Sequence, residues 1–265
     1  MDWKAIARSA TGTSHKKQQL PCQDYGQFII SNKVILGAVA DGSGSAKHSD
    51  VGAKLTVKTA LDELLRLRQC NVELHWPAKL LPDEQAGKFF TIILNKVVKA
   101  LQEQAASSDY SVNDLACTLL VFLATPNWVA AMQIGDGFIV ARLREGEDQL
   151  LFTPHKGEFI NETTFVTSAN ALNEMRVRVL PGQQKFICAS TDGLERVAIR
   201  MSDWTPFPPF FQPLEEYMVE TSHPEQEDEY IRNFLDSERL NAKTDDDKTL
   251  LLCLYDDSKV VRIQV

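Results

Sequence analysis

The chain has 265 residues, of which 44% are hydrophobic and 24% are charged, and its formal net charge is −8. This composition is ordinary for a soluble globular protein, and the negative charge argues against nucleic acid or an anionic membrane surface as the main partner. No apolar stretch approaches the length of a membrane span, and the first residues lack the apolar core of a signal peptide, so we expect a cytoplasmic protein.

The first half of the chain is expected to form strands followed by helices. The hydrophobic pattern predicts strands at 3–10, 25–31 and 34–40 and helices at 49–70 and 83–106. A tight turn, Ser31-Asn32-Lys33, would join the second strand to the third. On the second helix, the positions expected to face a sheet are Phe89, Ile92, Ile93, Val97 and Leu101.

The second half is expected to return to strands and then to helices. Two long strands are predicted at 115–124 and 128–143, with a hairpin turn at 125–127. The elements expected after them are an irregular polar stretch at 153–183, a strand at 186–191, a Pro- and aromatic-rich loop at 203–213, two helical stretches within 213–240 and two closing strands near Val265. This order favours an α+β fold in which stacked antiparallel sheets are covered by helices within a single domain, residues 1–265.

Aspartates stand at the ends of four of these apolar runs. Three of the acids follow a run and precede glycine, and they are Asp41, Asp136 and Asp192. The fourth is reversed, because Asp246 comes just before the run 250–255, as an antiparallel neighbour would need to reach the same edge of a sheet. Each Asp-Gly alone is a common turn signal. Four converging carboxylates repel one another unless a cation neutralises them, so the repetition favours a metal site.

The motifs around these acids resemble those of the metal-dependent serine/threonine phosphatases of the PP2C class, in particular a divergent bacterial branch. In chain order they are Pro21-Cys22-Gln23-Asp24, Ala40-Asp41-Gly42-Ser43-Gly44-Ser45, Ile134-Gly135-Asp136-Gly137, Ser190-Thr191-Asp192-Gly193-Leu194 and Asp246-Asp247-Lys248-Thr249. The resemblance spans residues from about 12 to 255. It implies a four-layer α-β-β-α sandwich with its metal centre at one end of the sheets.

The resemblance also implies the metal ligands. Asp41 would bridge two Mn²⁺ or Mg²⁺ ions, and the Gly42 carbonyl would bind one of them. Asp192 and Asp246 would hold the other ion, and Asp136 with Asp192 could hold a third, weaker one. All of these ligands are oxygen atoms, which hard divalent cations prefer.

Two further roles follow from the resemblance. Asp24 matches an acid that orients the attacking water. The family's phosphate-holding Arg is replaced by Gln19, but a short insertion would make His15 the candidate phosphate contact, with the lysines at 16–17 as alternates. A solvated loop histidine is the other interpretation of His15. Gln23 stands where many relatives have Glu, so one contact to a metal would lose its charge.

The implied activity is hydrolysis of phosphoserine and phosphothreonine on proteins by water or hydroxide activated between two cations, which would reverse a bacterial Ser/Thr kinase. The expected partners are phosphoproteins, either a cognate kinase or its targets, and we expect a monomer. Residues 153–183 match the family's variable flap, which would select substrates, or form an ordinary surface excursion. The main alternative is a catalytically weakened regulatory or binding module. A two-metal hydrolase of nucleotides or nucleic acid is disfavoured by the acidic balance.

Overall fold

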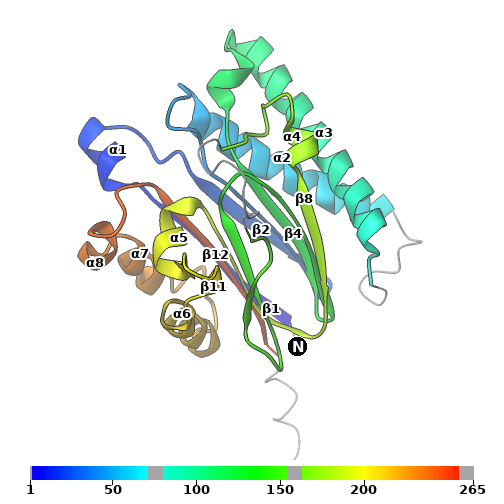
Figure 1. The fold of residues 1–265 in the computed structure, drawn as a ribbon, viewed down its shortest axis with the longest axis vertical. Helices are drawn as coiled ribbons and strands as arrows, with labels where there is room; N and C mark the ends of the chain where they lie inside the picture. The colour runs from blue at the N-terminus through cyan, green and yellow to red at the C-terminus, as the bar shows by residue number, and fades with distance from the viewer. Residues whose placement is uncertain (1, 71–79, 154–162, 257–265) are drawn as a thin grey trace, which may run out of the picture.

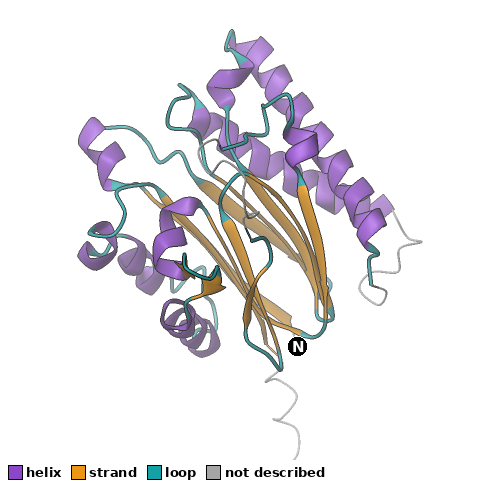
Figure 2. Cartoon of the chain, in the orientation of Figure 1, coloured by secondary structure: helices purple, strands orange, loops and turns teal. Residues whose placement is uncertain are grey.

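Two antiparallel sheets stack face to face at the centre of the molecule, and helices cover both outer faces (Figures 1 and 2). The computed structural model describes residues 2–70, 80–153 and 163–256. The layers follow the order helix, sheet, sheet, helix. This arrangement confirms the α+β four-layer sandwich expected from the motifs.

Sheet I has the strand order β1-β12-β9-β6-β7, and sheet II has the order β2-β3-β4-β5-β8. The strands of sheet I are β1 (Asp2–Ala10), β6 (Phe138–Leu143), β7 (Asp148–Leu150), β9 (Gln184–Ser190) and β12 (Lys248–Asp256). Those of sheet II are β2 (Tyr25–Ser31), β3 (Val34–Ala40), β4 (Leu119–Thr125), β5 (Trp128–Ile134) and β8 (Arg176–Pro181). A small ribbon pairs β10 (Ile199–Arg200) with β11 (Thr205–Pro206).

The helices divide between the two outer faces. Sheet II is covered by α2 (Ser49–Cys70) and α3 (Asp83–Ser108). Sheet I is covered by α5 (Glu195–Ala198), α6 (Pro208–Glu220), α7 (Glu229–Leu235) and α8 (Glu238–Asn241). The remaining short elements are α1 (Thr13–Gln18), α4 (Ala171–Glu174) and the 3-10 turns η2 (Val112–Leu115) and η3 (Asp192–Leu194).

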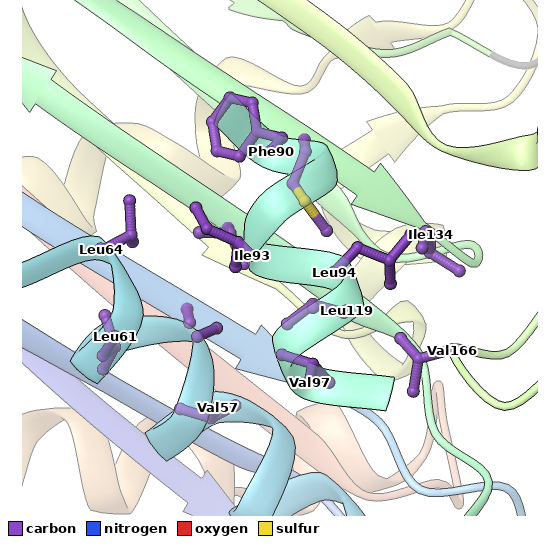
Figure 3. Packing of buried hydrophobic residues seen from close by; sticks show 14 of the residues in the cluster. Val57, Leu61, Leu64, Phe90, Ile93, Leu94, Val97, Leu119, Ile134 and Val166 are labelled. Carbon is purple, nitrogen blue, oxygen red and sulfur yellow. The ribbon is translucent and has the colours of Figure 1, made fainter. Parts of the chain in front are cut away.

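Three apolar clusters hold the layers together. The first joins α2 and α3 to sheet II and contains Phe90 and Ile93, both 0% exposed (Figure 3). The second lies between the sheets and contains Phe122 of β4 and Leu251 of β12. The third joins sheet I to its helices and contains Phe211. Because burial of apolar surface drives folding, these clusters determine how the layers stack.

Strand direction brings the ends of four strands to one edge of the sandwich. In sheet II, β3 and β5 both pair antiparallel with β4, so they run in the same direction and end at the same edge. In sheet I, β12 is antiparallel to β9, so β12 begins where β9 ends. The short segment 135–137 connects β5 of sheet II directly to β6 of sheet I, which keeps the two edges together.

Most predicted elements of the first half are confirmed, and one predicted strand of the second half is wrong. The strands at 25–31 and 34–40 and the helix at 49–70 have the predicted bounds. The single strand predicted at 128–143 is instead two strands in different sheets. The break occurs at Gly135, where φ is +97° and a Cβ atom would come within 2.4 Å of the Thr118 side chain.

The loop predicted at 203–213 is also wrong beyond residue 207, because α6 begins at Pro208. Proline is tolerated in the first turn of a helix, where its missing N–H has no intrahelical partner. The helices within 208–241 are three and not two, and the stretch 153–183 contains α4 and β8. Helix α1 was not predicted. The last predicted strand near Val265 lies outside the described residues, and within the described ranges no helix is both long and apolar enough to cross a membrane.

On α3, one of the residues predicted to face a sheet is exposed. Ile92 is 46% exposed, whereas its neighbour Ile93 is fully buried. We expect Ile93→Ala to lower the free energy of unfolding by about 2–5 kcal/mol, because it leaves a cavity in the core. The matched control Ile92→Ala should change it by no more than about 0.5 kcal/mol. Urea unfolding followed by circular dichroism measures both, and equal losses would contradict the orientation of α3.

Candidate metal centre

Three carboxylates meet at the edge where the strands end. Asp41 follows β3, Asp136 lies between β5 and β6, and Asp192 follows β9. One oxygen of each lies within 4.8 Å of the chosen oxygens of the other two. Asp41 and Asp192 are half-buried and Asp136 is exposed. The structure therefore brings together acids from both sheets, as predicted from the position of these acids at the ends of apolar runs.

Asp246 and Asp24 complete the acidic group. Asp246 precedes β12, and its negative charge contributes to raising the pKa of Asp24, Asp41 and Asp192, so it lies near them. It is not one of the three acids whose oxygens lie within 4.8 Å of one another. Asp24 precedes β2 and is only 5% exposed. Its Oδ2 accepts a hydrogen bond of 2.7 Å from the Thr191 hydroxyl, whereas its buried Oδ1 has no hydrogen-bond partner among the described residues.

Burial and mutual repulsion raise the pKa of these acids. Burial is the main cause for Asp41, whose pKa rises to about 11, and the charges of Asp24 and Asp192 add to it. Burial also raises the pKa of Asp24 to about 7. For Asp192 the pKa rises to about 7 through burial and then the charge of Asp136. Without added positive charge, the group therefore retains protons near neutral pH.

Polar side chains hold the acid-bearing loops in place. The Asp41 N–H donates to the Thr118 hydroxyl at 3.0 Å, and the Thr118 N–H donates to the Asp41 carbonyl at 2.8 Å. Around Asp136, the Gln133 amide donates to the carbonyls of Gly135 and Gly137 at 2.9 and 2.7 Å. These contacts orient the carboxylates before any ligand arrives, which is the condition for a preorganised site.

Two glycines allow the loops to approach one another closely. At Gly12 a Cβ atom would lie 2.3 Å from the Asp245 carbonyl oxygen. At Gly193 it would lie 2.0 Å from the Asp247 carbonyl oxygen. Both values are well below a real contact distance, so any larger residue would push apart the segments that carry Asp192 and Asp246.

Asp247 is the main residue that the sequence-based interpretation missed. It is 2% exposed, and its carboxylate accepts hydrogen bonds of 2.6 Å from the backbone N–H groups of Gly12 and Gln23. Its Oδ2 also lies 3.0 Å from Nδ1 of His15. One buried carboxylate therefore ties the start of β12 to the segments before α1 and β2. The doubled acid at 246–247 was a signal, but only the first acid was given a role.

The structure separates the proposed phosphate contacts from one another. The His15 side chain is 12% exposed and is held by Asp247. Its charge lies close enough to lower the pKa of Asp246 against the larger effect of burial, so the ring lies near the acids. Lys16 instead pairs with Asp236, at the end of α7. Gln19 is exposed at the end of α1 in a left-handed conformation.

A buried lysine lies beneath the acids. The Lys248 side chain is 0% exposed, and its Nζ donates to Asn241 Oδ1 at 2.9 Å and to the Asp246 carbonyl at 3.3 Å. Burial lowers the pKa of its ammonium group. The sequence signal was a lysine two residues before the apolar run 250–255. Its positive charge offsets part of the repulsion among the acids above it.

The segment between β7 and β8 contacts Asp136 through Thr163. The Thr163 hydroxyl donates to Asp136 Oδ2 at 2.6 Å. Residues 154–162, part of the stretch matched to the family flap, lie outside the described residues. Glu195, at the start of α5, is a further acid near the group, since burial and the charge of Asp136 raise its pKa to about 7. Neither Thr163 nor Glu195 was singled out from the sequence.

The donor set fits hard divalent cations. The clustered side chains offer only carboxylate oxygens, which Mg²⁺ and Mn²⁺ prefer over nitrogen or sulfur. The unpartnered oxygen of Asp24 and the raised pKa of Asp41 both indicate groups whose charge lacks compensation within the described chain. A bound cation would supply that compensation.

Comparison with known proteins agrees with this geometry. The model of the family described as "Protein phosphatase 2C" matches residues 11–236, most of the chain. The chain belongs to the protein phosphatase 2C family. A curated relative, serine/threonine-protein phosphatase 3 of Escherichia coli (strain K12), is 33% identical over 266 residues, which cover 96% of this chain and 99% of that protein.

Solved structures of phosphatases share the fold. A serine/threonine phosphatase of S. agalactiae has a TM-score of 0.62, with 15% identity over 96% of this chain and 100% of that one. PppA of Pseudomonas aeruginosa has a TM-score of 0.60 with 20% identity over 96% of this chain and 98% of that one. As a member of the 2C family, the chain is a protein serine/threonine phosphatase, an enzyme class that acts on phosphoproteins.

The contacts of Asp247 lead to a prediction about stability. Asp247→Ala would leave two buried N–H groups, of Gly12 and Gln23, without an acceptor, so we expect a loss of about 3 kcal/mol or more. The control is Asp245→Ala, which removes an exposed carboxylate and keeps the backbone carbonyl that Ser14 uses. Urea unfolding in EDTA measures both. Similar losses in the two variants would show that the Asp247 hydrogen bonds do not matter.

The raised pKa values lead to a prediction about pH. Asp24 and Asp192 keep their protons up to about pH 7 in the folded state, whereas an unfolded Asp loses its proton near 3.8. Their contribution to stability is therefore complete below about pH 4 and is lost as the pH rises through about 7. In EDTA, the melting temperature should therefore decrease as the pH is raised from about 5 to about 8.

The matched variant for this experiment is Asp192→Asn, whose amide has no proton to lose. It should reduce the loss of stability over that pH range by on the order of 1–3 kcal/mol, after allowance for partial exposure to solvent. The control is Asp62→Asn, on the exposed side of α2. If the pH dependence of Asp192→Asn equals that of the unsubstituted protein, the repulsion assigned to Asp192 is wrong.

Proposed function

We propose that this phosphatase hydrolyses phosphoserine and phosphothreonine on proteins with the help of two divalent cations, Mn²⁺ or Mg²⁺. The proposed ligands are Asp41, the Gly42 carbonyl, Asp192 and Asp246, and Asp136 would join Asp192 in holding a third ion. The observation that carries the proposal is the convergence of Asp41, Asp136 and Asp192 within 4.8 Å. An isolated bridge to Cys117 fixes the Gly42 backbone directly beside Asp41.

Bound cations would lower the pKa of a water molecule that they bind, and they would neutralise the charge that develops on the phosphoryl group. The part played by the chain itself is to hold the cations and to orient the attacking water. Asp24 has one oxygen fixed by Thr191 and the other buried without a partner. It can therefore orient a water molecule through Oδ1 and accept its proton. At Gly44 a Cβ atom would meet nothing within 4 Å, so that position is open, whereas at Gly42 it would lie 2.8 Å from the Gln23 carbonyl oxygen, so no side chain fits there.

His15 is the proposed phosphate contact. Because Nδ1 of His15 faces Asp247 Oδ2 at 3.0 Å, Nε2 is the ring nitrogen left to meet a substrate. A neutral ring that donates from Nδ1 offers only a lone pair at Nε2. Donation from Nε2 to a phosphate oxygen would therefore require a ring that carries both protons.

A weakened regulatory module remains the second candidate, and Gln23 is the observation that favours it. The Gln23 side chain is 8% exposed, and its Oε1 has no hydrogen-bond partner among the described residues. A neutral amide would support a cation less strongly than a carboxylate in the same place. Such a module would bind metal and phosphoprotein with little turnover.

The test of the proposed function is turnover of a phosphothreonine peptide with Mn²⁺. Asp41→Asn and Asp192→Asn should each lower the rate at least ~100-fold and weaken Mn²⁺ binding, as expected for changes to metal ligands. Asp62→Asn, an exposed acid on α2, is the control and should leave both unchanged. EDTA should abolish turnover.

The outcomes separate the candidates. If Asp41→Asn and Asp192→Asn turn over the peptide normally, the site is misassigned. If the unsubstituted protein binds Mn²⁺ and the phosphopeptide but does not release phosphate, it is the regulatory module. If a nucleotide is hydrolysed faster than the phosphopeptide, the protein substrate class is wrong. A kinase encoded beside the gene, phosphorylated and then offered as substrate, tests whether the chain reverses a Ser/Thr kinase.

A further inference from the structure

A cavity lies in the helical layer over sheet I, away from the acidic edge. It encloses about 690 Å³ and is bounded by α5, β10, α6, α7 and α8. Its floor is apolar and includes Phe210 and Leu214 of α6, Phe234 of α7 and Leu240 of α8. This volume falls within the range of about 300–1,000 Å³ that is typical of small-molecule sites.

Large apolar side chains are exposed at this cavity. Met201, Phe207 and Tyr230 line it and are 45%, 40% and 45% exposed. Single exposed apolar side chains are normal on a protein surface, but several around one concavity indicate a binding site. Burial of these side chains against an apolar ligand would contribute favourable free energy.

The charge of the cavity is opposite to that of the protein. Four of its lining residues are cations, Arg196, Arg200, Arg239 and Lys243, and none is an acid, although the chain has a net charge of −8. Within the described residues, the side chains of Arg196, Arg239 and Lys243 have no hydrogen bond and no ion pair. Arg200 contacts the Thr205 hydroxyl at 3.3 Å and lies over the Phe207 ring. Arg239 and Lys243 are therefore available for an anion, whereas Arg196 lies near Glu195 and Arg200 lies near Asp203.

We propose that this cavity binds a small amphipathic anion. The apolar body of the ligand would pack on the floor formed by Phe210, Leu214 and Phe234. A carboxylate or phosphate head group would contact Arg239 and Lys243. The concave shape and the volume favour a free small molecule over a protein segment as the occupant.

The position of the cavity suggests what the ligand would do. Arg196 lies four residues after Asp192, and Lys243 lies three residues before Asp246. The occupant would thus contact both segments that carry acids of the metal centre. Binding that shifts either segment changes the affinity for the metal, and by linkage the metal changes the affinity for the anion. This second part rests on the proposed function, whereas binding of the anion does not.

The test is calorimetric titration of the full chain in EDTA with decanoate, below the concentration at which it forms micelles. We expect saturable binding of one decanoate per chain. Decyltrimethylammonium, which has the same apolar chain and the opposite charge, should bind at least about tenfold more weakly. Arg239→Glu and Lys243→Glu should each weaken decanoate binding about tenfold. Lys58→Glu, an exposed site on α2, is the control and should have no effect.

Several results would overturn the proposal. The proposal is wrong if decanoate shows no saturable binding or if the cationic analogue binds with equal affinity. It is also wrong if Lys58→Glu weakens decanoate binding as much as Lys243→Glu does. An acidic aromatic peptide that binds here when decanoate does not would assign the cavity to a protein partner instead. Circular dichroism melts of each variant show that the fold is intact. Repeating the titration with saturating Mn²⁺ tests the coupling separately, since an unchanged affinity removes only that part.

Discussion

The electrostatic cost of gathering carboxylates is the constraint on which the rest of the structure depends. Asp41 and Asp24 are buried enough that desolvation alone is the largest cause of their raised pKa values, and each neighbouring acid adds repulsion. Such an arrangement persists only when a rigid framework imposes it. The three apolar clusters provide that framework, because they hold the two sheets so that their acid-bearing ends coincide.

The framework extends into the loops through groups that carry no charge of their own at the site. Thr118 and Thr191 fix Asp41 and Asp24 by hydrogen bonds, and Gly193 allows two loop backbones to come close. Lys248 brings a positive charge under the acids, but it is held by Asn241 and a carbonyl and not by the site carboxylates. Part of the repulsion therefore remains, and such a residual negative field would favour the binding of a divalent cation.

The sequence predicted the parts of the molecule that depend on local pattern. Burial on both faces of β3 and β9 produces continuous apolar runs, so the acids that follow them, Asp41 and Asp192, could be placed at one edge. The contact between His15 and Asp247 could not be foreseen, because those residues are 232 positions apart and are brought together by the pairing of β1 with β12. The break at Gly135 was missed because both flanking strands are apolar, although Asp136 followed by glycine was itself a turn signal. The φ angle of +97° at Gly135 is where the chain changes direction.

Negative and positive side chains gather in two separate regions, which the net charge of the chain does not reveal. The edge of the sheets gathers acids, and the helical layer over sheet I gathers Arg196, Arg239 and Lys243 around an apolar floor. Less than two turns of chain connect the regions at η3 and α5, so neither can move far without the other. Because one region suits cations and the other suits anions, ligands of the two would not compete for the same groups. Their influence on each other must pass through the short segments after Asp192 and before Asp246, which makes those segments the place where regulation of the metal centre would act.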